Sequence, residues 1–210
     1  MTPPLSQQDY ERLHGVMRAV LDGAGAHTTQ ACLFFSVVGG YLLEKYHKLN
    51  TTPLAGAALY GLGGDPPTVL TFGRFEDEVL VSDRAAFHAW IQVGDWAIDL
   101  MAPIFPENAA ERGIRVPVPR RSFQRHVDTM ASTLEDLEVA DTFLLVPDAP
   151  LTNALVSASL RRPATADLAN VCATWYRPYP QPMDEELILG SSDGAPRVMR
   201  LPTVSLEGSW

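Results

Sequence analysis

The feature that most constrains the fold is the stretch from Phe87 to Met101, which reads FHAWIQVGDWAIDLM. Gly94-Asp95 is a typical two-residue hairpin turn, and the residues on both sides of it are mainly β-branched or aromatic. With these two residues at the turn, the expected cross-strand pairs are Val93–Trp96, Gln92–Ala97, Ile91–Ile98, Trp90–Asp99 and His88–Met101. The sequence therefore predicts an antiparallel hairpin with a defined register.

Side chains alternate along a strand, so this register divides the hairpin into two faces. The face expected to enter the core is wholly apolar and comprises Phe87, Ala89, Ile91, Val93, Trp96, Ile98 and Leu100. The opposite face comprises His88, Trp90, Gln92, Ala97, Asp99 and Met101. On it, His88 and Asp99 are diagonal neighbours whose Cα atoms lie about 7–8 Å apart, so their side chains can meet. An imidazole beside a carboxylate is the orienting pair of a general base, which predicts a nucleophile nearby.

The size and charge of the chain limit the classes of protein in which this histidine–aspartate pair could act. The 210 residues, 46% hydrophobic and 20% charged, favour one globular domain over residues 1–210. A net charge of −9 argues against nucleic acid or a membrane surface as partner. No run of 18 apolar residues predicts a membrane span, and the start, MTPPLSQQDYERLHG, lacks a secretory pattern. We therefore expect a cytoplasmic protein with reduced thiols at Cys32 and Cys172.

The only cysteine expected at the start of an element is Cys32. Apolar residues from about Gln30 to His47 predict a helix that is buried on all sides for its first three turns, with Thr28 or Thr29 as its cap. Either cap places Cys32 in the first turn, at N2 or N3, where free N–H groups and the helix dipole favour a thiolate. Cys172 falls in the middle of another predicted helix and is expected to be a core residue.

The remaining elements are predicted from periodicity and turn signals. Further helices are expected at 6–22, 121–130, 150–160 and 164–176. Strands are expected at 53–62, 69–72, 78–81 and 142–146, with a proline-containing edge strand at 115–119. Residues 63–67 and 103–113 are expected to be loops, the second with one helical turn, and the tail after Pro178 has no clear period.

Cys32, His88 and Asp99 would together supply a nucleophile, a base and a residue that orients the base. Two ordinary alternatives exist, because a lone helical cysteine is usually an inert core residue and a lone strand histidine is usually structural. A zinc site built from His27, Cys32, His88 and Asp99 is a further alternative, but the spacing matches no common zinc motif.

The phrases CLFFSVVGGYLLEKY, AGAALYGL and FHAWIQVGDWAIDL resemble the core of the papain-like thiol superfamily in its transglutaminase-like branch. They are similar to the peptidases that mature lasso peptides, and also to a small bacterial family of that superfamily without a known activity. The resemblance covers about residues 28–102 and implies a triad of Cys32, His88 and Asp99. Gln30 resembles an oxyanion-hole glutamine but stands only two residues before Cys32, whereas the superfamily places it farther upstream. The backbone N–H of Cys32 is the alternative donor.

These observations predict an α+β protein of papain-like fold, with a buried helix on an antiparallel sheet and a helical elaboration at about 103–210. The predicted function is a cysteine hydrolase or acyltransferase that acts on a peptide or small-molecule amide or thioester through an acyl-enzyme, without a cofactor. Trp90, on the same face as His88, is expected to line the substrate groove. The alternative is a non-catalytic module that binds a peptide or small ligand on the same scaffold.

Overall fold

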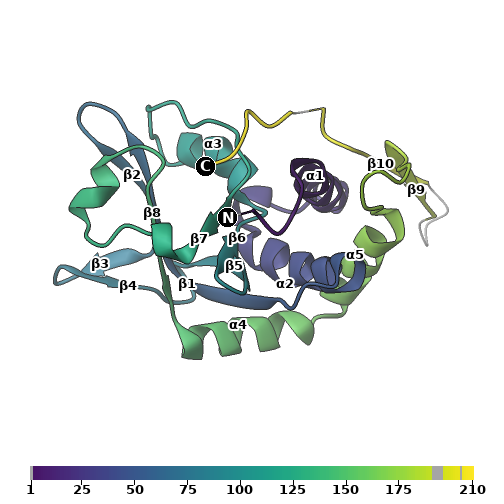
Figure 1. Ribbon diagram of the computed structural model, residues 1–210. Coiled ribbons are helices and arrows are strands. Elements are labelled where there is room, and N and C mark those ends of the chain that lie inside the picture. Colours follow the sequence, from purple (N-terminus) through teal and green to yellow (C-terminus); the bar gives the residue numbers. More distant parts are fainter. Residues whose placement is uncertain (1, 191–195, 204) are drawn as a thin grey trace.

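The computed structural model describes residues 2–190, 196–203 and 205–210, and it shows an α+β protein (Figure 1). Its main sheet is antiparallel, with strand order β2-β1-β5-β6-β7 and with β8 also paired to β1. The strands of this sheet are β1 (Thr52–Gly63), β2 (Thr68–Phe72), β5 (His88–Val93), β6 (Trp96–Ile98), β7 (Gln124–His126) and β8 (Phe143–Pro147).

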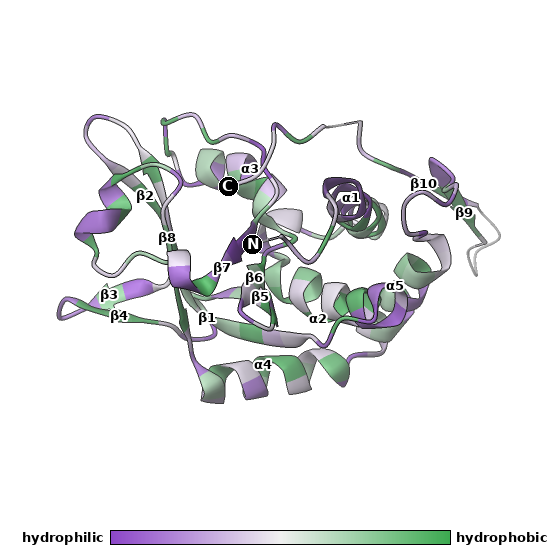
Figure 2. Ribbon diagram, in the orientation of Figure 1, coloured by the Kyte–Doolittle hydropathy of each residue, from purple (hydrophilic) through white to green (hydrophobic). Residues whose placement is uncertain are grey.

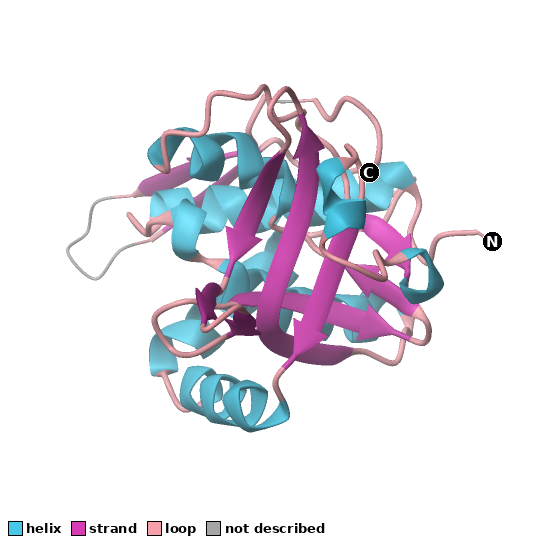
Figure 3. Ribbon diagram, turned by 90° about the vertical axis from the view of Figure 1, so that its left-hand side faces the viewer, coloured by secondary structure: helices cyan, strands magenta, loops and turns pink. Residues whose placement is uncertain are grey.

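The long strand β1 connects two parts of the sheet (Figure 3). Its first half pairs with β5, while its second half pairs with β2 and β8. The change of partners occurs at Gly56, where a Cβ atom would lie only 2.1 Å from the backbone oxygen of Val146. A glycine is therefore required for the close approach of β8 to β1.

The α-helices are α1 (Gln7–Gly23), α2 (Cys32–Leu42), α3 (Phe105–Glu111), α4 (Ala149–Leu160) and α5 (Pro163–Trp175). Ser6 caps α1 by accepting the N–H of Asp9 at 3.0 Å. Helix α2 contacts β1, β5, α1, α4 and α5, so it lies in the centre of the helical layer. The hydropathy of the two helices reflects these positions: in Figure 2, α1 carries a strongly hydrophilic side, whereas α2 is mostly hydrophobic.

The sheet separates two groups of buried side chains. The first packs helices α1, α2 and α5 against Ala89, Ile91, Ile98 and Leu100 of the hairpin. The second is aromatic and contains Tyr60, Phe72, Trp90, Phe105, Phe123, Phe143 and Trp210. Both faces of the hairpin are thus buried, and the face that carries His88 and Asp99 is covered by aromatic rings rather than by solvent.

Most of the predicted elements are confirmed. The hairpin has the predicted register for Ile91–Ile98, Gln92–Ala97 and Val93–Trp96, although β6 ends before Asp99. The predicted helices at 6–22, 150–160 and 164–176 and the strands at 53–62, 69–72 and 142–146 are also present. The strand expected at 78–81 is β4 (Val79–Val81), which forms a small hairpin with the unpredicted β3 (Arg74–Glu76).

The start of the buried helix differs from the prediction. Thr28–Gln30 forms a separate 3₁₀ turn, Ala31 is the N-cap of α2, and no side chain caps the helix. Cys32 is consequently the first helical residue, N1, rather than N2 or N3. The helix ends in a π-helical turn, Leu43–His47.

The predictions for the last half of the chain are partly wrong. Residues 121–130 are not a helix but contain β7 and a 3₁₀ turn at Val127–Thr129, because the Gln124 side chain bonds both backbone groups of Leu5 and fixes an extended segment. Residues 115–119 form no strand, and 102–111 form a 3₁₀ turn (Ala102–Ile104) followed by α3.

The tail contains β9 (Glu186–Leu189) and β10 (Arg197–Arg200), which pair with each other. Residues 103–210 therefore add strands to the protein as well as helices. In the part of the chain that the structure describes, no helix is long and apolar enough to cross a bilayer.

Candidate functional site

His88 and Asp99 form a buried pair on the aromatic side of the sheet. His88 is the first residue of β5, and Asp99 directly follows β6. The Nε2–H of His88 donates to Asp99 Oδ2 at 2.6 Å, and the two side chains are 0% and 1% exposed. The predicted face and the predicted contact are both present, but the pair is enclosed rather than on an accessible face.

Asp99 is held by several further donors. Its Oδ1 accepts the N–H of Met101 at 2.9 Å, and its Oδ2 accepts the hydroxyl of Tyr60 at 2.9 Å. The hydroxyl of Tyr10 donates to the backbone oxygen of Asp99. Burial, followed by the Asp99 charge, raises the pKa of both tyrosines well above the usual value, so both hydroxyls remain protonated donors. The carboxylate is therefore fixed in position before any ligand arrives.

Aromatic rings enclose the imidazole of His88. Phe72 lies 4.4 Å from it between ring centroids at an interplanar angle of 33°, Phe105 lies at 5.8 Å, and Tyr60 meets it edge-on at 6.0 Å. Burial lowers the pKa of His88, but the charge of Asp99 and the hydrogen bond to it outweigh this effect and raise the pKa to about 10. The Asp99 carboxylate therefore favours the protonated form of His88.

The second ring nitrogen of His88, Nδ1, is buried and has no hydrogen-bond partner among the described residues. The Cys32 thiol is near enough to contribute to the raised pKa of His88. Asp99 thus occupies one nitrogen of the ring and leaves the other available to Cys32. The structure brings together the three residues that the sequence pattern selected.

Contacts of α2 with β5 place Cys32 at this point. The hydroxyl of Ser36, one helical turn after Cys32, donates to the backbone oxygen of Trp90 at 2.7 Å. At Gly39 a Cβ atom would lie 2.5 Å from the Leu100 side chain, so the helix can approach the hairpin closely only because this residue is small. As residue N1, Cys32 also has a backbone N–H that the helix leaves without an intrahelical partner.

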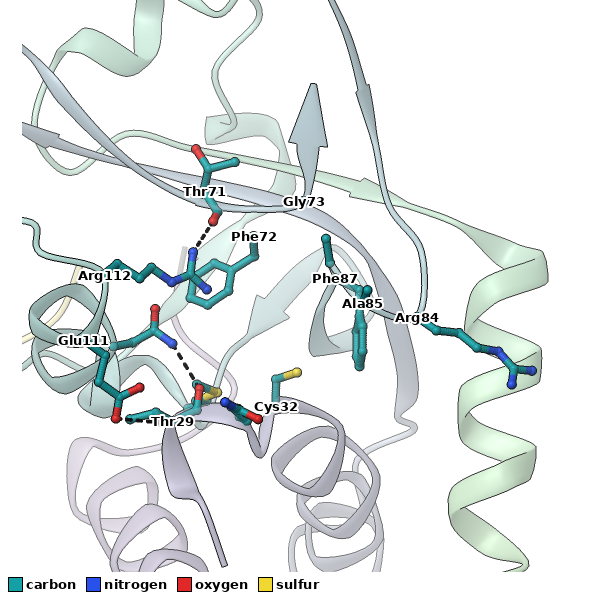
Figure 4. Close-up of a pocket in the computed structure, with 14 residues that line it drawn as sticks. Thr29, Cys32, Thr71, Phe72, Gly73, Arg84, Ala85, Phe87, Glu111 and Arg112 are labelled. Carbon is teal, nitrogen blue, oxygen red and sulfur yellow. Dashed lines mark hydrogen bonds between the residues drawn. The ribbon is translucent and has the colours of Figure 1, made fainter. Parts of the chain in front are cut away.

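Cys32 opens into a cleft of about 540 Å³. The cleft is lined by Thr29, Gln30, Cys32, Thr71, Phe72, Gly73, Arg84, Ala85, Ala86, Phe87, Met101, Asn108, Glu111 and Arg112. Figure 4 shows Cys32 at the floor, Phe87 on one side, and Arg112 with Glu111 on the other. Cys32 as a residue is 6% exposed, and of the three selected residues it alone lines the cleft.

The two other residues selected from the sequence lie in different places. Gln30 lines the cleft beside Cys32 and can offer its amide to a bound group. Trp90 does not line it, because its side chain is 2% exposed and packs in the aromatic cluster. The expectation that Trp90 forms a wall of the groove is wrong, since the hairpin face that carries it is covered by the C-terminal half of the chain.

Several residues of the site escaped the sequence analysis. Tyr60 lies in the predicted strand at 53–62, but nothing in its spacing indicated a bond to Asp99. Phe72 and Arg112 come from segments far apart in the sequence and meet as a guanidinium stacked on a ring, 4.6 Å from its centroid. His27, part of the zinc alternative, is exposed at the start of the 3₁₀ turn. No group of three His, Cys, Asp or Glu side chains suited to a metal ion occurs among the described residues.

Comparison with known proteins places the chain in a family. A family model described as "Protein of unknown function (DUF2026)" matches residues 6–210. The chain belongs to this family. A crystal structure named only as that of a genomics target is similar at 30% identity, with a TM-score of 0.85 over 100% of this chain and 98% of that one. No curated protein matches the sequence.

Proposed function

We propose that this member of the DUF2026 family is a cysteine-dependent hydrolase or acyltransferase of papain-like, transglutaminase-like type. The observation that carries the proposal is the buried His88–Asp99 pair, whose imidazole lies near Cys32, the site residue that opens into a cleft. A carboxylate that orients a histidine beside a nucleophile is the arrangement used for acyl transfer on several unrelated folds.

In the proposed reaction the Cys32 thiolate attacks the carbonyl carbon of an amide or thioester. The carbonyl oxygen becomes an oxyanion near the N–H of Cys32 and the amide of Gln30. His88 as imidazolium gives its Nδ1 proton to the leaving amine or thiol, and the carbon–nitrogen or carbon–sulfur bond breaks. The neutral ring then takes a proton from water or an amine, whose oxygen or nitrogen bonds to the acyl carbon. The carbon–sulfur bond breaks, which releases the acyl product and restores the Cys32 thiolate beside the His88 imidazolium.

The setting of the thiols is consistent with this chemistry. Cys32 and Cys172 are both free, as a reducing compartment such as the cytoplasm would keep them. Burial raises the pKa of Cys172 to about 12, so this second thiol is unreactive in the folded protein. Cys32 is the only cysteine that we expect to react.

The experiment uses p-nitrophenyl acetate as an acyl donor and mass spectrometry of the digested protein. We expect nitrophenolate release with an acetyl group on Cys32, no label on Cys172, and no acetylation of Cys32→Ser. His88→Gln should slow acylation by about 10²–10⁴-fold, provided that its melting curve shows a folded protein. Release of the acetyl group to water, or to added glycinamide, would distinguish a hydrolase from an acyltransferase.

The alternative is a module that binds a peptide or small ligand in the cleft without reacting. It predicts a folded protein in which Cys32 is acetylated no faster than a free thiol. Equal labelling of Cys32 in the wild type and in a folded His88→Gln would also contradict the catalytic proposal.

A further inference from the structure

The cleft contains a guanidinium that the protein does not neutralise. Arg112 follows α3, lines the cleft, and forms no ion pair with any residue that the structure describes, although the chain carries 25 acidic residues. Arg18 and Arg120, which are near this end of the molecule and less exposed than Arg112, both pair with Glu107 at 2.9 Å. Arg125, outside the cleft, also forms no ion pair with the described residues and lies over the Phe143 ring, so Arg112 is distinguished by its position in the cleft.

The immediate surroundings of Arg112 hold its side chain in place but leave several of its N–H donors without an acceptor in the described part of the chain. One Nη1–H donates to the backbone oxygen of Thr71, and the guanidinium lies over the Phe72 ring. Glu111 also lines the cleft and attracts Arg112 but forms no ion pair with it, and its Oε1 accepts the hydroxyl of Thr29 at 3.1 Å. A guanidinium has five N–H donors, so several remain for a ligand.

Partial desolvation beside Phe72 lowers the pKa of Arg112, although the side chain remains exposed to the cleft. An anionic group bound in the cleft could be held by two parallel hydrogen bonds from the guanidinium. Figure 4 shows Arg112 beside Phe72 and Thr71, above the floor that carries Cys32, whereas Arg84 extends away from Cys32. The position of Arg112 therefore suits a group on the same ligand that reacts at Cys32.

We propose that the cleft selects acyl substrates that carry a carboxylate or a similar anionic group, and that Arg112 binds this group. This inference rests on the proposed function, because it assigns a substrate class to the same site. Arg112 is a specificity-determining residue in this scheme. Cys32, His88 and Asp99 would perform the chemistry on the acyl carbon.

Two alkylating reagents of nearly equal size test the proposal without a known substrate. Iodoacetate is an anion and iodoacetamide is neutral, and both alkylate a thiolate with loss of iodide. We would measure the rate of Cys32 alkylation by each reagent and divide the iodoacetate rate by the iodoacetamide rate. The same ratio for glutathione serves as the reference for a free thiol.

For the wild type we expect a ratio roughly two- to tenfold above its value in Arg112→Gln, as Coulomb's law gives for unit charges separated by several ångströms in a well-hydrated site. Raising the ionic strength from about 0.01 M to 1 M should shrink this difference, because the screening length falls from about 30 Å to 3 Å. The iodoacetamide rate should be the same in both proteins.

Arg84→Gln is the matched control, since it removes a cleft arginine that points away from Cys32 and should keep the wild-type ratio. Arg112→Met is a second neutral variant, which retains packing on Phe72 if Arg112→Gln unfolds. An unchanged ratio in a folded Arg112 variant overturns the assignment of substrate class alone. A Cys32 that reacts with neither reagent overturns the proposed function and this inference together.

Discussion

His14 and His88 are both buried histidines, on opposite sides of the sheet, and their pKa values move in opposite directions. On the helical side, His14 stacks on Phe35, 5.7 Å between centroids, and Nδ1 bonds the backbone oxygen of Leu100 at 2.9 Å. Burial dominates there and lowers its pKa to about 4. On the aromatic side, Asp99 outweighs burial and raises the pKa of His88 to about 10.

The comparison shows that enclosure alone does not decide whether a histidine is charged, because one carboxylate reverses its effect. The two residues also affect stability in different pH ranges. The interaction of protonated His88 with Asp99 contributes fully to stability at pH values below about 6.5, the ordinary pKa of histidine. This contribution is lost as the pH rises through about 10. His14 favours the folded state above about 6.5, and its contribution is lost as the pH falls toward 4.

Removing the charge of Asp99 should have the largest effect, because it makes His88 resemble His14. In Asp99→Asn the side chain keeps an acceptor for the N–H of Met101 but offers an N–H to His88, which favours the wrong tautomer. We expect Cys32 acylation to fall by about 10⁴-fold, as for the equivalent change in serine proteases. Alkylation of Cys32 at pH 6 should fall as well. A folded variant with the wild-type alkylation rate would remove Asp99 from the site.

The second change acts on the other side of the sheet. His14→Gln removes the titrating ring but keeps a donor for the Leu100 carbonyl, so the loss of stability between pH 6.5 and 4 should become shallower. The shift to about 4 corresponds to about 3 kcal/mol at most. Urea unfolding at several pH values measures this, with acylation of Cys32 at pH 7 expected to remain unchanged. Equal pH dependence in both proteins would show that His14 does not titrate as its surroundings indicate.

The smallest effect is expected from the tyrosines that hold Asp99. Tyr60→Phe removes the hydroxyl that donates to Oδ2 and should cost about 1.5–3 kcal/mol, the range for a hydrogen bond to a charged group. It should also alter the pH dependence of Cys32 alkylation, since the carboxylate next to His88 loses a donor. Tyr10→Phe is the matched control, because Tyr10 bonds only the backbone oxygen of Asp99. It should lower stability but leave that pH dependence unchanged.

The hairpin could be predicted from the sequence because its turn and its alternation are local signals. The register of Ile91 with Ile98 follows from Gly94-Asp95 alone, and from that register follows the meeting of His88 with Asp99. Cys32 could be placed at a helix start for the same reason. The site residues found correctly lie in two strongly patterned segments, the start of α2 and the hairpin β5–β6.

The errors concern contacts between distant segments. Trp90 alternates correctly but is covered by residues such as Phe123 and Phe143, whose positions depend on how the last half of the chain folds back. The segment 121–130 has a helical period, yet pairing with β6 and the bonds from Gln124 to Leu5 hold it extended. Arg112 could not be selected either, because its position in the cleft over Phe72 depends on segments that are far apart in the sequence.

The rings of Phe72, Phe105 and Tyr60 around His88 also limit how protons travel. With a fully buried imidazole, bulk water and buffer have no direct route to either nitrogen. Protons must then pass through the cleft, by way of the Cys32 sulfur or a ligand bound there. The Nε2 proton shared with Asp99 would exchange slowly with solvent, and its far-downfield proton NMR resonance would report on occupancy of the cleft without any chemical label.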